Sequence, residues 1–517
     1  MNSFVLRRYW PVIALLGGLR LVFWGGAFPN PDEAYYWLWG QHLDWSYFDH
    51  PPWHAWVQGL AAAGLGRSPW VLRLPNLITT GLLGGLYWAI CHQLYGRQAE
   101  NAFWLTVVLG LTSPLFFLFL AMAWHDHWLI LFGTAASYCL IQFLSRDRLD
   151  AYPWLYGAGA LLGLAGLCKY LALFLGIGFL VAIATHVRWR SLLGNGHLYG
   201  AIAIALLAMT PVWAWNAHHE FYSFQFYLGR SVAADTTDWH WGGPGFFLLL
   251  SGLIFGPAHS WLALKAVKRG FTTAFGATYQ RVTWVIFGTS TLLLALLSLR
   301  VPVLYYWNIL AYPLLLPLLA GVFLSFHRLI ELRDRRWLHG AIALGSFAAA
   351  CLVIHYTVLP LSALVSDSGD DDTRMLYGWP SIAAIVTQEA ATFAAPPLLL
   401  TTDYRSAAAL AYVLNEPSVM ALSGRIDQFD FWYDPAQLDG RDGILVGDRW
   451  HPICPTHLAM FTHTDPATTL TVERWGIPIK AYTLVRGYGF QAHHTTANPL
   501  HPDYPLAFTT DGETCTP

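Results

Sequence analysis

The chain has 517 residues, of which 55% are hydrophobic and 12% are charged, with a formal net charge of −2. A typical soluble domain carries about 25% charged residues, so the composition argues against a soluble globular protein. The 26 Trp and 25 Tyr exceed the needs of a soluble core and suit membrane–water interfaces. The sequence shows no basic tail, glycine-rich phosphate loop or Cys-x-x-Cys pair, which disfavours nucleic-acid-binding, nucleotide-binding and zinc-finger classes. We therefore predict a multi-pass α-helical membrane protein.

Eleven stretches are predicted as transmembrane helices, because a helix needs about 20 mostly apolar residues to cross the bilayer. They lie near residues 10–28, 74–94, 102–121, 128–144, 153–168, 170–187, 198–214, 244–264, 282–299, 304–325 and 338–359. The fifth and sixth are short and close together, so they also fit one merged or re-entrant segment. The first is interpreted as an uncleaved span, because its apolar run is long and "GGAFPNP" is a poor signal-peptidase site.

Positive residues predict how these spans are threaded through the membrane. Arg and Lys precede the first span and follow the second, fourth, sixth, eighth and tenth spans. Alternate threading places all of them on one side, which is then cytoplasmic. The N-terminus is predicted to be inside and the C-terminus outside.

The composition changes after Leu361, where "SDSGDDDTR" is typical of a polar linker. The stretch from "PPLLLTTD" to "VMALSG" predicts strand, helix, strand, and "DGILVGD" predicts a further short strand. We therefore expect two domains: a membrane domain at residues 1–360 and a small external α/β domain at residues 361–517. Cys454 and Cys515 lie in the second domain, either as a disulfide formed in an oxidising compartment or as two unpaired thiols.

Ionisable residues recur at the predicted external ends of the spans. The set comprises Asp32 and Glu33 after the first span, Arg73 at the second, His125-Asp126-His127 between the third and fourth, Lys169 between the fifth and sixth, and Arg300 between the ninth and tenth. Ionisable groups at membrane depth are costly and usually functional. Because these groups share one face, we expect one site that opens outward and toward lipid.

The residue types in this set indicate the chemistry. Asp32, Glu33 and Asp126 could deprotonate an acceptor or hold a cation, while Lys169, Arg73 and Arg300 suit a phosphate or pyrophosphate. Acidic groups beside phosphate-binding groups at a membrane surface predict a lipid-linked phosphate substrate. A polyprenyl-phosphate sugar fits, since its phosphate leaves well when cations stabilise it and one carboxylate suffices to take the acceptor proton.

Several motifs resemble one family in the order in which they occur. They are "PDEAYYWLWGQHLDWSYFDHPP", "RLPNLI", "HDHWLILF", "GLAGLCKYLALF" and "YYWNILAYPLLLPLLA". Over residues 5–360 the layout resembles the GT-C membrane glycosyltransferases, in particular the family-39-like branch with the protein O-mannosyltransferases and the bacterial lipid A aminoarabinose transferases. The later stretches "TTDYRSAAALAYVLN" and "FDFWYDP" are similar to the external domain of bacterial members.

The resemblance implies roles for the residues that match. The first acidic residue after the first span acts as the catalytic acid or base, which implies Asp32 here, with Glu33 beside it. The second acidic position implies Asp126, and the basic position near the fifth and sixth spans implies Lys169 as a ligand of the donor phosphate. The further substrate-binding candidates are Arg73, Asp49, His50 and Arg300.

The resemblance also implies a bacterial inner-membrane hexosyl- or pentosyltransferase that works by inverting displacement at the external (periplasmic) face. The expected partners are a polyprenyl-phosphate-linked sugar donor, a lipid, glycan or protein acceptor, and membrane lipids, with no nucleic acid. The sequence leaves metal dependence open, since a metal-free carboxylate base and a divalent cation both fit the residues. Asp32, His125, Asp126 and His127 nevertheless form a candidate ligand set for a divalent cation, because histidines flanking Asp126 are unusual for the family.

Each candidate residue also has a structural alternative. A helix-terminus role suits Asp32 and Asp126, an ion pair suits Glu33, and snorkelling to the interface suits Lys169. Two other protein classes remain open as well. A transporter or flippase of lipid-linked sugars would need inverted repeats, of which none is visible. A non-catalytic envelope assembly protein would leave Asp32, Asp126 and Lys169 unexplained.

Overall fold

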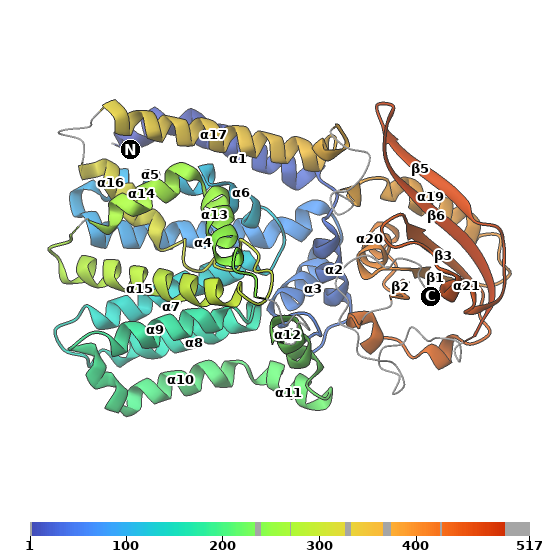
Figure 1. Ribbon diagram of the computed structural model, residues 1–517, viewed down its shortest axis with the longest axis horizontal. Coiled ribbons are helices and arrows are strands. Elements are labelled where there is room, and N and C mark those ends of the chain that lie inside the picture. Colours follow the sequence, from blue (N-terminus) through green and yellow to red (C-terminus); the bar gives the residue numbers. More distant parts are fainter. Residues whose placement is uncertain are drawn as a thin grey trace. The chain divides into compact units, whose positions relative to one another are not determined.

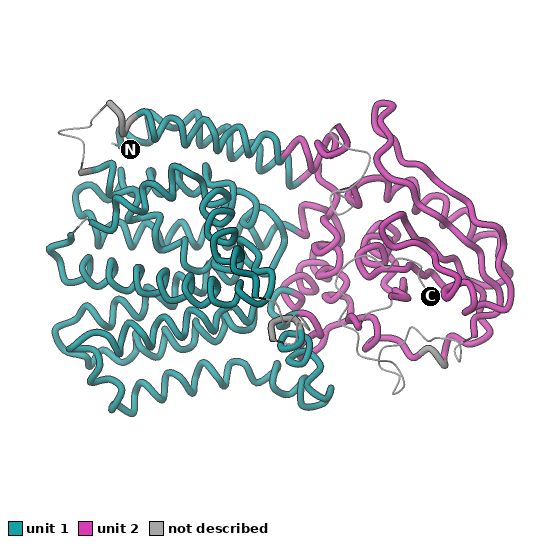
Figure 2. The backbone as a smooth tube through the Cα atoms, in the orientation of Figure 1, with its two compact units in different colours: residues 1–24, 50–54, 73–352 teal, residues 25–49, 55–72, 353–517 magenta. Residues whose placement is uncertain are grey.

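The computed structural model describes residues 3–232, 239–268, 270–325, 332–364, 374–423 and 426–491. The chain divides into two compact units, which Figure 2 distinguishes by colour. Unit 1 comprises residues 1–24, 50–54 and 73–352, and unit 2 comprises residues 25–49, 55–72 and 353–517. Two short segments from the N-terminal part of the chain therefore belong to the same compact unit as the C-terminal domain. A single domain boundary near residue 360 stays a prediction.

Helices make up unit 1, and each predicted span overlaps a helix or a pair of helices (Figure 1). The helices of unit 1, some of whose ends extend into unit 2, are α1 (Phe4–Gly26), α4 (Pro69–Tyr95), α5 (Ala99–Thr112), α6 (Pro114–Phe119), α7 (Asp126–Leu144), α8 (Tyr152–Cys168), α9 (Ala172–Ala184), α10 (Gly196–Ala208), α11 (Thr210–His218), α12 (Tyr222–Val232), α13 (Gly243–Phe255), α14 (Pro257–Val267), α15 (Ala274–Leu297), α16 (Leu315–Ser325) and α17 (Leu332–Thr357), of which α12 overlaps no predicted span.

Among the described residues, five segments are long and apolar enough to cross a membrane, and two bent helix pairs raise this number to seven. The α10–α11 pair bends by 51° and the α13–α14 pair by 101°. Pro211 and Pro257 lie in the first turn of the second helix of each pair, where a proline cannot donate a backbone hydrogen bond. The protein is thus a multi-pass membrane protein, while the number of eleven spans stays a prediction.

The predicted tenth span is helical only in its second half. Residues 301–314 form turns, and the helix α16 begins at Leu315. Tyr87 and Tyr279 donate hydrogen bonds of 3.1 Å and 2.8 Å to the carbonyls of Pro313 and Leu314. Non-helical backbone is tolerated at membrane depth only where its polar groups are satisfied by the protein. These buried tyrosines therefore stabilise the irregular segment, which hydropathy alone does not distinguish from a helix.

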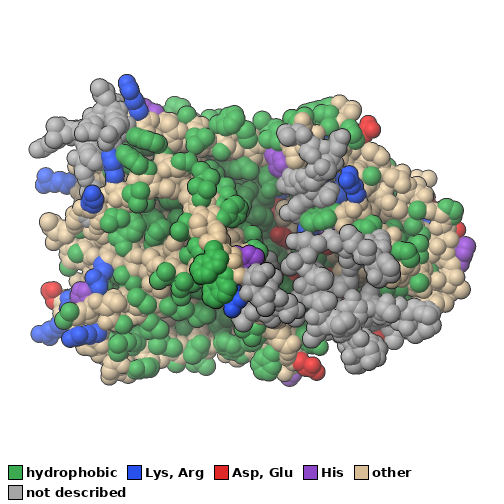
Figure 3. Space-filling view, viewed as in Figure 1, with side chains coloured by type: hydrophobic (Ala, Val, Ile, Leu, Met, Phe, Trp, Pro, Cys, Tyr) green, Lys and Arg blue, Asp and Glu red, His purple; other side chains and the backbone are tan. Residues whose placement is uncertain are grey.

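Hydrophobic side chains cover most of the visible face of unit 1 (Figure 3). Lys and Arg side chains gather at the end of this unit where the N-terminus lies (Figures 1 and 3). Inside the unit, α8 and α10 pack closely at Gly159. A Cβ atom at this position would overlap the backbone of Ala201, so only glycine fits there. Small residues permit such close approach in membranes, where van der Waals packing rather than water exclusion holds helices together.

Unit 2 contains a six-stranded sheet with the order β2-β1-β3-β6-β4, in which β5 also pairs with β6. The strands are β1 (Leu398–Thr401), β2 (Met420–Ala421), β3 (Gly443–Asp448), β4 (Phe461–Thr464), β5 (Thr468–Arg474) and β6 (Ile477–Phe490). The helices and the 3₁₀ turns used below are α2 (Pro31–Gln41), α3 (Trp53–Leu65), α19 (Trp379–Ala390), α20 (Tyr404–Leu414), η4 (Leu361–Leu364) and η5 (Gln428–Phe431). The predicted strand–helix–strand segment and the following strand are confirmed as β1, α20, β2 and β3.

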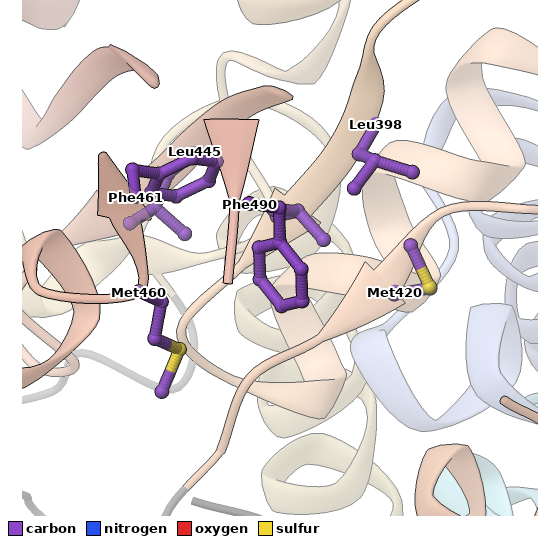
Figure 4. Packing of buried hydrophobic residues seen from close by; sticks show 7 residues of the cluster. Leu398, Met420, Leu445, Met460, Phe461 and Phe490 are labelled. Carbon is purple, nitrogen blue, oxygen red and sulfur yellow. The ribbon is translucent and has the colours of Figure 1, made fainter. Parts of the chain in front are cut away.

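The first three strands of unit 2 are parallel and the rest are antiparallel. Every residue of β3 is buried, which matches its continuous apolar run. Side chains from β1, β2, β3, β4 and β6 pack into one core (Figure 4), which consists of Leu398, Leu400, Met420, Leu445, Met460, Phe461 and Phe490. The helix α20 begins where Asp403 accepts a 2.8 Å hydrogen bond from the backbone of Arg405.

Cys454 is disulfide-bonded in this structure, while its predicted partner Cys515 lies outside the described residues. The other four cysteines are free thiols, namely Cys91, Cys139, Cys168 and Cys351. All four lie in helices of unit 1. A disulfide persists in an oxidising compartment, so the oxidation state of Cys454 can be used to test the predicted external location of unit 2.

We expect the denatured, unreduced protein to bind four maleimide groups and the reduced protein to bind six, since four of its six cysteines are free thiols. Gel shifts with a polymer-linked maleimide measure this number. A Cys454→Ser variant should bind five groups in both conditions, because the partner of Cys454 is then a free thiol. Six groups on the unreduced wild-type chain would contradict the disulfide and would speak against the predicted external location of unit 2.

Candidate functional site

A buried ion pair lies at the start of α7 in unit 1. The Lys169 Nζ atom is 3.0 Å and 3.1 Å from the two carboxylate oxygens of Asp126. The side chains are 12% and 3% exposed respectively. Asp126 is the first residue of α7, where the helix dipole favours a carboxylate. Lys169 occupies the break between α8 and α9 in extended backbone conformation. The structure thus brings together two of the predicted site residues.

Histidines surround this pair. The His125 ring lies 4.3 Å from the His50 ring and 5.3 Å from the His54 ring, measured between centroids. His127 Nδ1 is 2.9 Å from Thr79 Oγ1, and His54 Nε2 is 2.7 Å from a backbone carbonyl. The predicted residue His50 therefore belongs to the same cluster as Asp126, and His54 joins it although the sequence did not suggest it.

Aromatic rings connect the ion pair to an apolar cavity. The Lys169 ammonium lies 5.1 Å from the centroid of the Tyr306 ring, and this ring is 5.3 Å from that of Tyr305. Tyr305 lines a cavity of about 420 Å³ between α13 and the segment that follows α15. The other lining residues are mostly apolar and include Phe246, Leu250, Val301, Pro302, Val303 and Leu304. A charged group and an apolar chain can therefore be held side by side in unit 1.

The predicted carboxylate pair after the first span lies in unit 2 and has two separate roles. Glu33 is fully buried and accepts a 2.8 Å hydrogen bond from the backbone of Asn30, whose side chain accepts one of 3.0 Å from the backbone of Asp32. This reciprocal arrangement is a capping box that fixes the start of α2. Asp32 is only partly buried in the first turn of α2. The geometry therefore assigns Glu33 to helix capping and leaves Asp32 as the carboxylate that could reach a substrate.

The position of α2 depends on hydrogen bonds to η5. The Tyr35 hydroxyl donates to Asp49 at 2.9 Å and accepts from the backbone of Gln428 at 3.0 Å. The Gln428 side chain in turn accepts a 2.7 Å bond from the backbone of Phe48. Burial first, and then the negative charge of Asp49, raises the pKa of Tyr35 well above its ordinary value, so the phenol remains a donor. Residues 30–49 are therefore attached to η5 at two points.

Close backbone packing also fixes α2. A Cβ atom on Gly40 would overlap the backbone of Gly59, so α2 and α3 cross at two glycines. The Tyr47 ring stacks on that of Trp39 with centroids 4.5 Å apart, and its hydroxyl donates a 3.0 Å bond to the Trp39 carbonyl. The aromatic run Tyr35–Trp39 is buried and thus belongs to the interior of unit 2.

Two predicted phosphate ligands lie elsewhere in unit 1. Arg73 is buried, and its guanidinium donates bonds of 3.1 Å to the carbonyls of Phe23 and Trp24 in the last turn of α1. Carbonyls at a helix end lack intrahelical partners, so Arg73 caps α1. Arg300 is exposed and its guanidinium lies 4.3 Å from the Trp239 ring centroid. Arg300 thus remains accessible to a headgroup, whereas Arg73 is engaged in the fold.

The candidate cation site does not fit a metal ion. Within the part of the chain that the structure describes, no three His, Cys, Asp or Glu side chains are arranged to hold one. His125 and His127 point into contacts with His50 and Thr79, as described above, rather than converging on one point with Asp126.

The chain is similar in sequence and in fold to known membrane glycosyltransferases. Residues 49–215 match the family model described as dolichyl-phosphate-mannose-protein mannosyltransferase. The lipid A galacturonosyltransferase RgtD of Rhizobium johnstonii is 26% identical over 405 residues, which cover 75% of this chain and 78% of that protein. These matches support the predicted resemblance to the GT-C glycosyltransferase superfamily.

The fold of the chain is also similar to crystal structures of ArnT from Cupriavidus metallidurans. The structure bound to undecaprenyl phosphate has a TM-score of 0.59 at 17% identity, and the apo structure has 0.57 at 18% identity. Both comparisons cover 92% of this chain and 97% of that chain. The predicted family resemblance is therefore confirmed.

We expect Lys169→Met to lower the free energy of unfolding by about 3–5 kcal/mol, because it leaves the Asp126 charge buried without its partner. Adding Asp126→Asn should recover part of this loss, since no charge then remains. Thermal and denaturant unfolding of the detergent-purified protein measures both effects, with Lys268→Met at an exposed lysine as control. A Lys169→Met variant as stable as the control would contradict the burial of the pair.

We expect Tyr35→Phe to accelerate amide hydrogen exchange in residues 42–49, because the variant loses the bonds to Asp49 and to the Gln428 backbone. The Tyr488→Phe variant is a matched control, since Tyr488 also donates one bond, of 3.0 Å, to a carboxylate within unit 2. Mass spectrometry of the full chain measures the exchange. Equal protection of residues 42–49 in both variants would show that Tyr35 does not hold this segment.

Proposed function

We propose that this GT-C enzyme transfers a sugar from a polyprenyl-phosphate carrier to an acceptor at the external face of the membrane. The observation that carries the proposal is the buried Lys169–Asp126 pair beside an apolar cavity in unit 1. A lipid-linked sugar phosphate has the same two parts, an anionic phosphate and an apolar isoprenoid chain. The ArnT structure bound to undecaprenyl phosphate, which has the same fold, supports this class of donor.

The donor phosphate is assigned to Lys169. Its ammonium carries three N–H donors, so two bonds to Asp126 leave capacity for a phosphate oxygen. Asp126 holds the ammonium in place through these two bonds. The first isoprene units then occupy the cavity next to Tyr305. The exposed guanidinium of Arg300 is assigned to the carrier headgroup, since arginine binds phosphate in a bidentate manner.

Asp32 is assigned as the catalytic base. Its carboxylate takes the proton of the acceptor hydroxyl as the acceptor oxygen bonds to the anomeric carbon from the face opposite the phosphate. The bond between that carbon and the phosphate oxygen breaks, and its electron pair leaves with the polyprenyl phosphate. The configuration at the anomeric carbon is therefore inverted. The product phosphate is a stable anion, so this step needs stabilisation of charge rather than an acid on the leaving group.

The external location rests on the placement of charge. Lys and Arg side chains gather at the N-terminal end of unit 1 (Figure 3), and such clusters mark the cytoplasmic side. A bacterial inner-membrane enzyme with unit 2 in the periplasm fits this pattern. The similarity to a lipid A galacturonosyltransferase makes a lipid A-type glycolipid the first acceptor to assay. A pentose and a hexuronic acid are the first sugars to test on the carrier.

We expect Asp32→Asn to abolish transfer while the protein accumulates normally in the membrane, because the amide cannot accept the acceptor proton. Removal of a general base lowers rates by roughly 10²–10⁴-fold. The measurement compares envelope lipids and glycans by mass spectrometry in a deletion strain complemented with wild-type protein, with Asp32→Asn or with Asp439→Asn at an exposed carboxylate.

A sugar-sized mass difference should return with wild-type protein and with Asp439→Asn, but not with Asp32→Asn. That result identifies the sugar and the acceptor together. Full restoration by Asp32→Asn would refute Asp32 as the base. A deletion that changes no envelope molecule, combined with altered accumulation of carrier-linked sugar, would instead favour a flippase.

A further inference from the structure

The turn between β5 and β6 carries an unusual residue. Arg474 pairs with Ile477, so Trp475 and Gly476 alone form the loop of this hairpin. Their φ angles are 53° and 74°, which correspond to the tight turn that suits the right-handed twist of two antiparallel strands. Such turns favour Asn-Gly, because a bulky side chain is strained at positive φ. Trp475 is nonetheless 74% exposed, so packing within the protein does not explain the tryptophan.

The hairpin is attached to the segment that follows α17. Val472 of β5 packs against Gly378, where a Cβ atom would overlap the valine side chain. The Arg474 guanidinium lies 5.4 Å from the Tyr377 ring centroid. On the next strand, the Tyr482 ring lies 5.3 Å from that of Trp379. The hairpin therefore has a fixed position relative to residues 377–379.

The same segment is attached to the end of a membrane span. The Tyr377 hydroxyl donates a hydrogen bond to the carbonyl of His355, which lies in the last turn of α17. Residues 336–357 of this helix are long and apolar enough to cross a membrane. In addition, β6 approaches η4, which begins four residues after α17 ends. These contacts, all within unit 2, connect the hairpin to the level at which the last span leaves the bilayer.

We propose that the tip of the β5–β6 hairpin inserts Trp475 into the headgroup region of the bilayer at the end of α17. The indole ring suits this region because it combines an apolar body with a polar N–H group. Arg474, which is exposed beside it, can meet lipid phosphates. The tip then holds the sheet of unit 2 at a set height above the membrane. This role is independent of the transferase chemistry proposed above.

A lipid surface fits this tip better than a protein partner. One exposed tryptophan buries about 150–250 Å², whereas a stable protein interface takes about 800 Å² from each partner. The neighbours Glu473, Arg474, Gly476 and Pro478 are exposed as well, and they add little apolar area. A single ring on a narrow hairpin is too small for specific protein recognition but sufficient for the interface of a bilayer.

The experiment uses the full chain in lipid nanodiscs with its four helix cysteines replaced by alanine. An environment-sensitive fluorophore is attached at Pro478→Cys, next to the turn, so that Trp475 is retained. A matched control carries the fluorophore at His463→Cys. The His463 side chain is 70% exposed and pairs with Tyr488, eleven residues along β6 from Ile477. Eleven residues of strand span roughly 37 Å. Lipids with a spin label near the headgroup act as quenchers, and iodide reports exposure to water.

We expect lipid quenching to be about threefold greater at position 478 than at position 463, because only a probe at the bilayer interface meets the spin label. Trp475→Asn should then reduce the quenching at 478 to the control level. Asparagine suits the turn better than tryptophan, so this loss cannot come from unfolding of the hairpin.

Equal lipid quenching and equal iodide quenching at the two positions would overturn the proposal. Protection of the probe at position 478 from both quenchers would also overturn it, and would indicate that the tip contacts protein instead. Unchanged lipid quenching in Trp475→Asn would also overturn it, because α17 alone would then hold the hairpin at the membrane.

Discussion

One electrostatic interaction is central to unit 1. The Lys169 ammonium is largely buried away from water, so its charge needs a partner of opposite charge nearby. An isolated ammonium at membrane depth is costly, and Asp126 compensates it at 3.0 Å. This requirement explains why α7 begins at an acidic residue and why the chain breaks between α8 and α9. Both features present charged groups at helix ends, where backbone dipoles and side-chain donors can meet a substrate phosphate. The ion pair therefore contributes to the fold and to the proposed chemistry at the same time.

The helices of unit 1 were predictable because hydropathy records a local property, namely the apolar length that a bilayer demands. Residues 301–314 were not, because their departure from helical structure depends on hydroxyl groups of Tyr87 and Tyr279, far away in the sequence. The first strands of unit 2 were predictable from buried apolar runs. The strands β4, β5 and β6 were missed, since their mixed exposure gives a weaker pattern.

The candidate site was predictable only in part, for a similar reason. Asp126 and Lys169 were recognisable because charged residues are rare at membrane depth. Glu33 had the same chemistry as Asp32, and only the capping box separates their roles. That motif, Asn30 followed by Glu33 three residues later, was readable in the sequence as a helix start. Gln428 could not be found, since its contacts with Tyr35 and Phe48 join segments almost 400 residues apart in the chain.

The double attachment of Gln428 has a consequence for chimeric enzymes. Residues 30–49 and η5 are hydrogen-bonded to each other, although most of the chain lies between them in the sequence. Consider a chimera that takes the C-terminal domain from a relative but keeps residues 30–49 of this chain. It would lose Gln428, whose side chain accepts a bond from the Phe48 amide and whose backbone donates one to Tyr35. A chimera that keeps these contacts therefore takes both pieces from the same parent, and a crossover near residue 360 separates them.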